Sequence, residues 1–531
     1  MIGTSKAEYL FIRGSILFLH NIAPASLLYC ALLLLSPRLL PAAQTYRAPF
    51  PIEAWLLAEA VFYLLIFLPN KYLLQRSAIH PDLPCREERE LLFKRCNANV
   101  THPERYLSRW FFGARIEDIK RENVKEFFRW AFLNTGDTRE EDEKELEGYV
   151  TATEKLLGKE IPPGRGNARS LRLTLDKVDF WHRSLLWYFC IGVVDTIMSC
   201  RMFLYGFHFH RSSLAEFFTV FPFRPLTLLS AKTSPVKHLT YWHRPHSSKT
   251  RLPVLFVHGI GVGLYPYTNL LRDLNKAGEA CVTDGEVGII ALEIMPVSSR
   301  MTSPVLEKDV MMQEIQTIVR HHGWDKFVLV SHSYGSIIST HLLKSPLTAP
   351  LIGPLVFLDP VSFLLHLPDV AYNFTAREPI HANEHQMWYF GSKDMGVAHA
   401  LGRKFFWSEN IVWKEDLGLQ PDENGRPGRD VTVVLSGKDL IVDTDAVRRY
   451  LLGTSSKASE AADDQAVATT GTGQSRVSRY VARGAGAPET GSGKLEVLWY
   501  HHLDHAQVFD TEVTRQPVIK AIGASSGFAR G

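Results

Sequence analysis

Three long apolar stretches lie in the N-terminal part of the chain. Residues 15–35 contain no charged side chain, and at about 1.5 Å per residue they can cross a hydrocarbon core of roughly 30 Å. Residues 54–70 are shorter and carry Glu59, so they could span, re-enter or form a buried helix. Residues 184–207 contain Asp195 and Arg201, which are costly at a bilayer centre. We predict one or two transmembrane helices within 1–77, and a buried or interfacial helix at 184–207.

Charge around the first two stretches predicts their orientation. Basic residues before the first and after the second outnumber the two in the connecting loop: Lys6, Arg13, Lys71, Arg76, Arg86 and Arg89 against Arg38 and Arg47. If both stretches span, the large C-terminal part faces the cytosol. If only the first spans, that part is luminal, and the N-x-T sites at Asn99 and Asn373 become glycosylation candidates. A cleaved signal peptide is the competing interpretation, but the apolar run is longer than is usual and lacks a nearby cleavage site.

The rest of the chain changes character near Val254. Residues 78–253 predict a mainly helical region that leads into the first strands, with helical apolar spacing in "NVKEFFRWAFLN". From Val254 short apolar segments alternate with amphipathic ones, in "VLFVHG", "YTNLLRDLNKAG" and "VGIIALEI". This alternation predicts an α/β domain over 254–519, with a mainly parallel sheet covered by helices on both faces.

Two segments within 254–519 depart from this rhythm. Residues 361–428 form a long insertion rich in large apolar side chains, which we expect to be a cap. Residues 454–494 are rich in Ser, Ala, Gly, Thr and Asp, and we expect them to be a disordered loop because they bury too little apolar surface to offset the entropy of ordering.

Composition excludes several classes of protein. The 531 residues carry a formal charge of only +3, and no basic run interleaves with aromatic residues, so we predict no nucleic-acid partner. The six cysteines are scattered without a repeated spacing, which is typical of reduced thiols. The histidines near the C-terminus lack an H-E-x-x-H arrangement, and His208 and His210 read as ordinary surface or half-buried residues, so we predict neither metal nor cofactor.

The segment "KFVLVSHSYGSIISTHLL" joins a predicted strand directly to a predicted helix. Ser333 lies at the corner, in the pattern S-x-S-x-G, where an attacking hydroxyl would be exposed at the end of a sheet. A serine hydroxyl needs a histidine base and a carboxylate that orients it. Asp439, in "SGKD", and His505, in "HHLDHA", each follow a later strand, and Asp359 in "VFLDP" is an alternative acid. We expect His332, next to Ser333, to be a packing residue.

An oxyanion site needs two backbone N–H donors. The turn "VHGIGVG" from Val257 to Gly263 follows the first clear strand, and we expect Ile260 or Gly261 to supply one donor. Tyr334, directly after the serine, would supply the other.

The serine corner, the glycine-rich turn, and the later aspartate and histidine give the chain from about Val254 to Phe509 a resemblance to the α/β-hydrolase superfamily. As a whole, the chain is similar to membrane-anchored members found in fungi. The order Ser, Asp, His along the chain is the order of that superfamily. The resemblance implies Ser333 as nucleophile, His505 as base, Asp439 as acid and "HGIG" as oxyanion loop. Ser331 departs from the family pattern, which usually has glycine there.

The sequence therefore predicts a membrane-anchored serine hydrolase. It would cleave carboxylic esters of hydrophobic or lipid-like character through an acyl-enzyme on Ser333. One alternative is an acyltransferase that uses the same acyl-enzyme. The other is a catalytically inactive scaffold that keeps the fold. The partners predicted are a small-molecule or lipid ester and the membrane, and the sequence indicates no oligomeric state.

Overall fold

A computed structural model of the chain describes residues 2–39, 47–276, 285–421, 427–453, 468–483 and 493–527. Its centre is a ten-stranded sheet in the order β1-β2-β4-β3-β5-β6-β7-β10-β9-β8. The strands are β1 His208–His210, β2 Thr240–Arg244, β3 Val254–Val257, β4 Ile289–Glu293, β5 Phe327–His332, β6 Ile352–Leu358, β7 Val431–Ser436, β8 Ala468–Thr470, β9 Val477–Arg483 and β10 Lys494–Tyr500.

The six central strands, from β4 through β3, β5, β6 and β7 to β10, are parallel. The outer strands at both edges are antiparallel to their neighbours. The carboxyl ends of the parallel strands therefore share one edge of the sheet. The residues after β3, β5, β6, β7 and β10 meet there, which is where α/β sheets bind their ligands.

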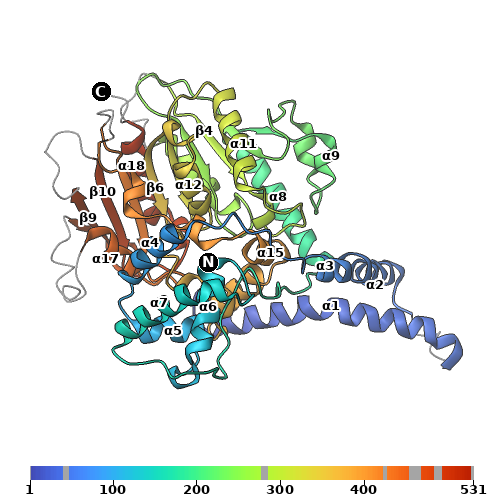
Figure 1. Cartoon of the computed structure of the whole chain (residues 1–531). Helices are drawn as coiled ribbons and strands as arrows, with labels where there is room; N and C mark the ends of the chain where they lie inside the picture. The colour runs from blue at the N-terminus through green and yellow to red at the C-terminus, as the bar shows by residue number, and fades with distance from the viewer. Residues whose placement is uncertain are drawn as a thin grey trace.

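Helices cover both faces of the sheet (Figure 1). The α-helices in the described parts of the chain are α1 Lys6–Leu39, α2 Phe50–Phe62, α3 Leu68–Leu73, α4 Arg86–Asn97, α5 Pro103–Trp110, α6 Arg121–Leu133, α7 Glu140–Leu157, α8 Leu185–Leu204, α9 Leu214–Phe217, α10 Thr268–Lys276, α11 Lys308–His321, α12 Gly335–Lys344, α13 Asp369–Ala371, α14 Ala382–Met387, α15 Met395–Arg403, α16 Trp407–Asn410, α17 Thr444–Leu452 and α18 Glu512–Ser526. Side chains of α8, α10 and α18 join one buried cluster, and those of α11, α12 and α17 join the other.

The helical region that precedes the sheet is part of the main core. Phe93, Trp110, Phe127 and Leu146 from α4 to α7 belong to the same buried cluster as the sheet and the cap. The rings of Phe93 and Tyr149 stack at 4.2 Å. The sequence suggested only a connecting role for this region, because its helical spacing shows that it buries a face but not against what.

Among the residues that the structure describes, three helices are long and apolar enough to cross a membrane. They are Lys6–Leu35 within α1, Phe50–Leu73, which includes α2 and α3 with a π-helical turn between them, and Leu185–Leu204, which is α8. Figure 1 shows α1 and α2 side by side, extending away from the body of the molecule. The first turns of α1 pack on the cap, where Ile12 and Ile16 join a cluster with Ala382 and Tyr389.

Two of the predicted boundaries differ from the structure. The sheet begins before Val254, since β1 and β2 belong to it, and the last helix continues beyond residue 519. The predicted disordered loop is wrong for residues 468–483, which form β8 and β9 and pair with β10. Val477 and Tyr480 of β9 are buried and belong to the two hydrophobic clusters of the domain, so these two side chains anchor the β8–β9 hairpin in the core. The remainder of that prediction, 454–467 and 484–492, lies outside the described residues.

Candidate active site

Ser333 sits at a sharp turn between β5 and α12. Its φ is +51°, a left-handed conformation that is costly for a residue other than glycine and that is found where function requires it. The close approach of helix and sheet explains the small neighbour, because a Cβ on Gly335 would lie 2.4 Å from the carbonyl oxygen of Val257. Ser331, where the family pattern has glycine, is buried within β5 beside Val257, so a serine fits this corner.

The structure brings Ser333, His505 and Asp439 together although they are far apart in the sequence. Nε2 of His505 lies 2.9 Å from Oγ of Ser333, and Nδ1 of His505 lies 2.7 Å from Oδ2 of Asp439. The other carboxylate oxygen of Asp439 accepts the N–H groups of Ile441 and Val442 at 2.8 and 3.0 Å. Because Nδ1 keeps its proton and donates a hydrogen bond to Asp439, Nε2 is left with the lone pair that a general base needs.

Asp359, the alternative acid, lies beside this chain but does not hydrogen-bond to His505. Its two oxygens accept the N–H groups of Ser436 and Ala506, each at 2.9 Å. The side chain is fully buried. It therefore ties the end of β7 to the loop that carries His505, and the hydrogen-bond partner of His505 Nδ1 is Asp439.

The carboxylates around His505 set its proton affinity. Burial lowers the pKa of His505, but the charge of Asp439 and its hydrogen bond, with further help from Asp359 and Asp504, outweigh burial and raise the pKa to about 9. Burial also raises the pKa of Asp359, to about 6. The site thus favours the imidazolium, which is the form that a proton transfer from serine would create.

The glycine-rich turn after β3 lies against the serine. A Cβ on Gly259 would come within 2.7 Å of Cβ of Ser333, so only glycine fits. The N–H of Gly261 donates to the carbonyl of Val297 at 3.0 Å, which removes Gly261 as an oxyanion donor in this conformation. Within the described part of the chain, the N–H groups of Ile260 and Tyr334 have no hydrogen-bond partner, and both residues line the cavity beside Ser333.

His258 holds this turn in place. Its Nδ1 lies 2.7 Å from the carbonyl oxygen of Gly259, and its Nε2 lies 2.9 Å from the N–H of Ile294, so Nδ1 donates and Nε2 accepts. Burial lowers the pKa of His258 to about 4, which keeps it in that neutral form. The sequence placed His258 in the glycine-rich turn but predicted no function for its side chain.

His332 is buried, and its Nδ1 lies 2.8 Å from the hydroxyl of Tyr267. That hydroxyl also accepts the N–H of Gly259 at 3.2 Å. Burial, with His505 and His258 nearby, holds the pKa of His332 well below its usual range. The structure therefore places His332 in a network that supports the glycine turn, consistent with the packing role expected for it.

A small cavity of about 50 Å³ opens beside Ser333. Its walls come from three parts of the chain: the helical region before the sheet, the turn and elbow, and the cap. Apart from Ser333 and Thr375 the lining is apolar or aromatic: Trp110, Trp130, Leu173, Ile260, Tyr334, Val361, Leu365, Val370, Ala371, Phe374, Leu401, Phe405, Trp407 and Ile441. The sequence predicted a cap over residues 361–428 but gave no role at the site to Trp110, Trp130 and Leu173, because nothing in the local pattern shows which core a buried tryptophan joins.

Two clusters of described residues have ligand atoms close enough to suggest a metal. One is Asp359, Asp439 and His505, in which Asp439 hydrogen-bonds to His505 and both carboxylates accept backbone N–H groups. The other is His210, His243 and His322, whose ligand atoms lie within 4.8 Å of one another. The rings of His243 and His322 are 3.8 Å apart and only 32° from parallel, so their nitrogen lone pairs do not converge. We assign no metal to either cluster.

The strand order, the parallel centre and the serine at the turn after β5 together define an α/β-hydrolase fold. No protein-family model matches the sequence, and no curated protein matches it.

Solved structures give distant likenesses. A bacterial membrane phospholipase A is similar over 65% of this chain and 94% of its own, at 10% identity and a TM-score of 0.36. A carboxylesterase of the thaumarchaeon Nitrososphaera gargenis is similar over 55% of this chain and 96% of its own, at 13% identity and a TM-score of 0.32. Carboxyl esterase 2 of the fungus Tuber melanosporum is similar over 56% of this chain and 84% of its own, at 13% identity and a TM-score of 0.32. At these scores they carry no argument about this chain, and the fold assignment depends on the strand order and the turn.

Proposed function

We propose that the chain is a membrane-anchored serine hydrolase that cleaves carboxylic esters with a hydrophobic acyl group. The observation that carries the proposal is the hydrogen-bonded series from Ser333 through His505 to Asp439, with 2.9 and 2.7 Å between the bonded atoms, at the edge of an apolar cavity. A serine, a base and an acid in this geometry are the parts that nucleophilic acyl transfer needs.

The reaction would proceed in two halves. Oγ of Ser333 attacks the ester carbonyl while Nε2 of His505 takes its proton, and the carbonyl oxygen becomes an oxyanion held by the N–H groups of Ile260 and Tyr334. The imidazolium then gives that proton to the departing alcohol, which leaves an acyl-enzyme on Ser333. In the second half His505 takes a proton from water, the hydroxide attacks the acyl carbon, and Ser333 recovers its proton as the acid leaves.

The cavity suggests the class of acyl group. Most of its lining is apolar carbon, and the indole N–H groups of Trp110, Trp130 and Trp407 already donate to other protein groups. A polar or charged acyl group would therefore lose its hydration with little compensation. A volume of about 50 Å³ admits a short acyl chain in this conformation. A lipid-length chain would require the cap helices to move.

We further propose that α1 and the Phe50–Leu73 helix both span the membrane, with the catalytic domain in the cytosol. The first turns of α1 and the far end of the second helix both contact the body, as Ile12 packs on the cap and Gln75 bonds Val178 at 2.9 and 3.0 Å. A hairpin of this kind puts the N-terminus and the body on the same side. Asn373 is buried and donates to the carbonyl of Ile441 at 2.9 Å, so this N-x-T site cannot carry a glycan in the folded protein.

A direct test is hydrolysis of p-nitrophenyl esters of increasing chain length by the full chain in detergent. We expect turnover with short esters, lost in Ser333→Ala and retained in Ser345→Ala, a serine just beyond the C-terminal end of α12. Adding an acceptor alcohol distinguishes the related acyltransferase, because a transferase would form a new ester while a hydrolase would release the free acid. A folded chain with no turnover of any ester would contradict the proposal.

A further inference from the structure

We propose that the catalytic domain itself docks on the lipid bilayer, through one apolar face made by the outer side of α8 and by residues 213–229. We call this surface the α8–α9 face. Its exposed large side chains are Phe189, Val193, Ile197, Phe203 and Leu204 on α8, and Leu214, Phe218, Phe223, Leu228 and Leu229 beyond it. This inference adds a second membrane contact and rests on the membrane anchoring proposed above.

Helix α8 has two unlike sides. One side is buried on the domain, through Tyr188, Ile191, Asp195, Met198 and Met202. The opposite side exposes an apolar stripe three to four residues apart, of which Phe189 is 67% and Leu204 83% exposed. A soluble helix packed this way would carry polar residues on its outer side. An apolar outer side is typical of a helix that lies in a membrane interface.

Buried ion pairs keep α8 on the domain and prevent it from crossing the bilayer. Asp195 bonds Arg224 at 2.8 Å and Arg300 at 2.5 Å. Arg224 also makes a bidentate pair with Glu293 of β4 at 2.7 and 2.8 Å. Pulling α8 into hydrocarbon would separate these charges, which is strongly unfavourable. The helix therefore meets lipid with one side only.

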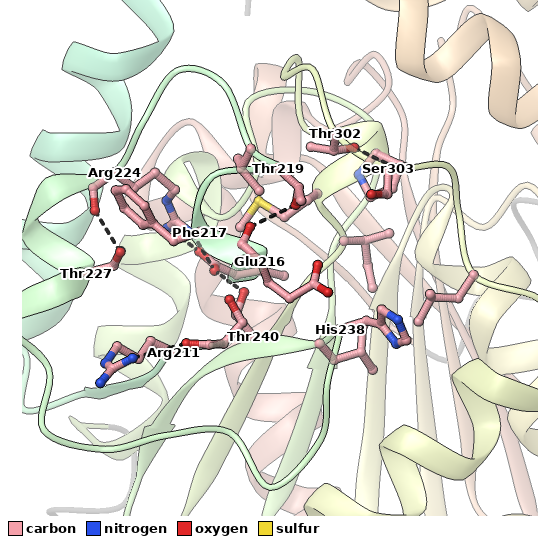
Figure 2. Close-up of a pocket in the computed structure, with 18 of the residues that line it drawn as sticks. Arg211, Glu216, Phe217, Thr219, Arg224, Thr227, His238, Thr240, Thr302 and Ser303 are labelled. Atoms are coloured by element: carbon pink, nitrogen blue, oxygen red, sulfur yellow. Dashed lines mark hydrogen bonds and ion pairs between the residues drawn. The ribbon is translucent and has the colours of Figure 1, made fainter. Parts of the chain in front are cut away.

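Residues 213–229 extend the apolar surface outward. Figure 2 shows Glu216 and Phe217 beside the cavity beneath this segment, together with Arg211, His238 and Thr240. The cavity has a volume of about 100 Å³, so part of the segment stands away from the sheet. The segment is held by the ion pairs of Arg224 and by two backbone hydrogen bonds of 2.9 Å between Phe221 and Met301. The only charged residues in the segment are Glu216, which lines the cavity, and Arg224, which is buried. Its outer side is left to leucine and phenylalanine.

The face continues directly from the proposed membrane helices, and this continuity argues for lipid as its occupant. Phe62 of α2 lies 5.7 Å from Tyr188 of α8 and 6.0 Å from Phe221, measured between ring centroids. Phe221 lies 5.8 Å from Phe223. Glu59 of α2 is buried and accepts the N–H of Leu186 at 3.3 Å.

The depth of these contacts follows from the sequence of the second helix. From Ala54 to Leu68 its only charged residue is Glu59, and the next is Lys71, so residues 60–68 belong to the apolar part of the span. Body residues packed on this stretch, such as Tyr188 and Phe180, which contact Phe62 and Phe67, must lie near the hydrocarbon edge. In Figure 1 α8 and α9 lie on the side of the body from which α1 and α2 extend.

The test is fluorescence quenching in the full chain, reconstituted in phosphatidylcholine vesicles with lipid brominated near the headgroup. Bimane is attached to a single cysteine at Leu229 or Phe189 on the face, with native cysteines replaced by serine or alanine. The matched control is Val513, an equally apolar residue that is 64% exposed on α18, on the side of the body away from α9. Leu32 of α1, 58% exposed, reports on the anchor itself.

We expect brominated lipid to lower the fluorescence at Leu229 and Phe189 by roughly twofold, since interfacial side chains sit about 5–10 Å into the headgroup boundary. The fluorescence of bimane at Val513 should fall by less than a tenth of the decrease seen at Leu229 and Phe189. Quenching at Leu32 but not at Leu229 and Phe189 would overturn the inference while leaving the anchor intact. No quenching at any of the four positions would overturn both. Cross-linking between copies through Leu229, without quenching, would make the face a protein interface and would also overturn the inference.

Discussion

The substitution Asp439→Asn separates the two carboxylates near His505. The backbone N–H groups of Ile441 and Val442 hold one carboxylate oxygen at 2.8 and 3.0 Å, so the amide oxygen of asparagine will take that position. The amide NH₂ group then faces Nδ1 of His505, which lay 2.7 Å from the other oxygen. An NH₂ group can only donate, so the imidazole must accept at Nδ1 and carry its proton on Nε2. Nε2 then faces Ser333 without a lone pair.

This exchange of tautomer should cost most of the base catalysis. The equivalent change in a well-studied serine protease lowers kcat about 10⁴-fold with the geometry intact, and we expect a loss of roughly 10³ to 10⁴, or about 4 to 5.5 kcal/mol of transition-state stabilisation. Folding should change little, because the side chain keeps its shape and its two backbone bonds.

Asp359→Asn is the matched control. Both oxygens of Asp359 accept backbone N–H groups, from Ser436 and Ala506, at 2.9 Å each. In Asp359→Asn the amide NH₂ replaces one of these oxygens and faces a backbone N–H, so two buried donors meet without an acceptor. This should destabilise the fold by about 1–3 kcal/mol, while His505 keeps its tautomer and kcat falls by roughly tenfold or less. Steady-state hydrolysis of p-nitrophenyl butyrate, with thermal unfolding of each variant, measures both effects. An Asp439→Asn enzyme that retains activity, or an Asp359→Asn enzyme that is folded and equally inactive, would refute the reasoning.

Four further outcomes follow from the geometry. Because the pKa of His505 is raised to about 9, the neutral base is scarce at pH 7, and kcat/KM should rise roughly 10- to 50-fold between pH 7 and 9; a flat profile contradicts this. Gly335→Ala forces a Cβ to within 2.4 Å of a carbonyl oxygen and should destabilise the protein by about 1–3 kcal/mol in thermal unfolding. The control Gly148→Ala, inside α7 where space is open, should instead stabilise it by up to about 1 kcal/mol. Phe374→Ala enlarges the cavity and should shift the preferred p-nitrophenyl ester to a longer chain; an unchanged preference argues against this cavity as the acyl site. Arg224→Ala removes the arginine that pairs with buried Glu293 and leaves Asp195 with Arg300 alone, and it should cost about 3–5 kcal/mol in denaturant unfolding, more than removal of an exposed arginine.

The meeting of the candidate catalytic residues was the most predictable part of the structure from sequence. Ser333, Asp439 and His505 each follow a strand, and parallel strands end at one edge, so their meeting required only the strand pattern and the chain order. The choice between Asp439 and Asp359 as the acid was harder. Both residues follow strands that end at the same edge of the sheet, and only the side-chain geometry shows that Asp439 reaches Nδ1 of His505. Gly261 was an equal candidate for the oxyanion site until the structure showed its N–H bonded to Val297.

Long-range packing was less predictable. The aromatic residues of α4 to α7 share the core of the catalytic domain, but their local pattern shows only that one side of each helix is buried. Strands β1 and β2, with the sequences HFH and TYWHR, lack the apolar run that marks β3 in the sequence. They form by pairing with the edge of a sheet made elsewhere in the chain. Similarly, β8 and β9 lie in a segment whose composition resembles disorder, and β10 supplies the edge that orders them.

The central claim is that Ser333 is the nucleophile, and the most direct measurement is the site of covalent modification by a fluorophosphonate. Such a probe reacts with a serine activated by a neighbouring base. The full chain, treated with the probe, digested and mapped by mass spectrometry, should carry the adduct on Ser333, and labelling should fall to background in Ser333→Ala and in His505→Ala. An adduct on a different serine, or a folded protein that is not labelled, would contradict the account.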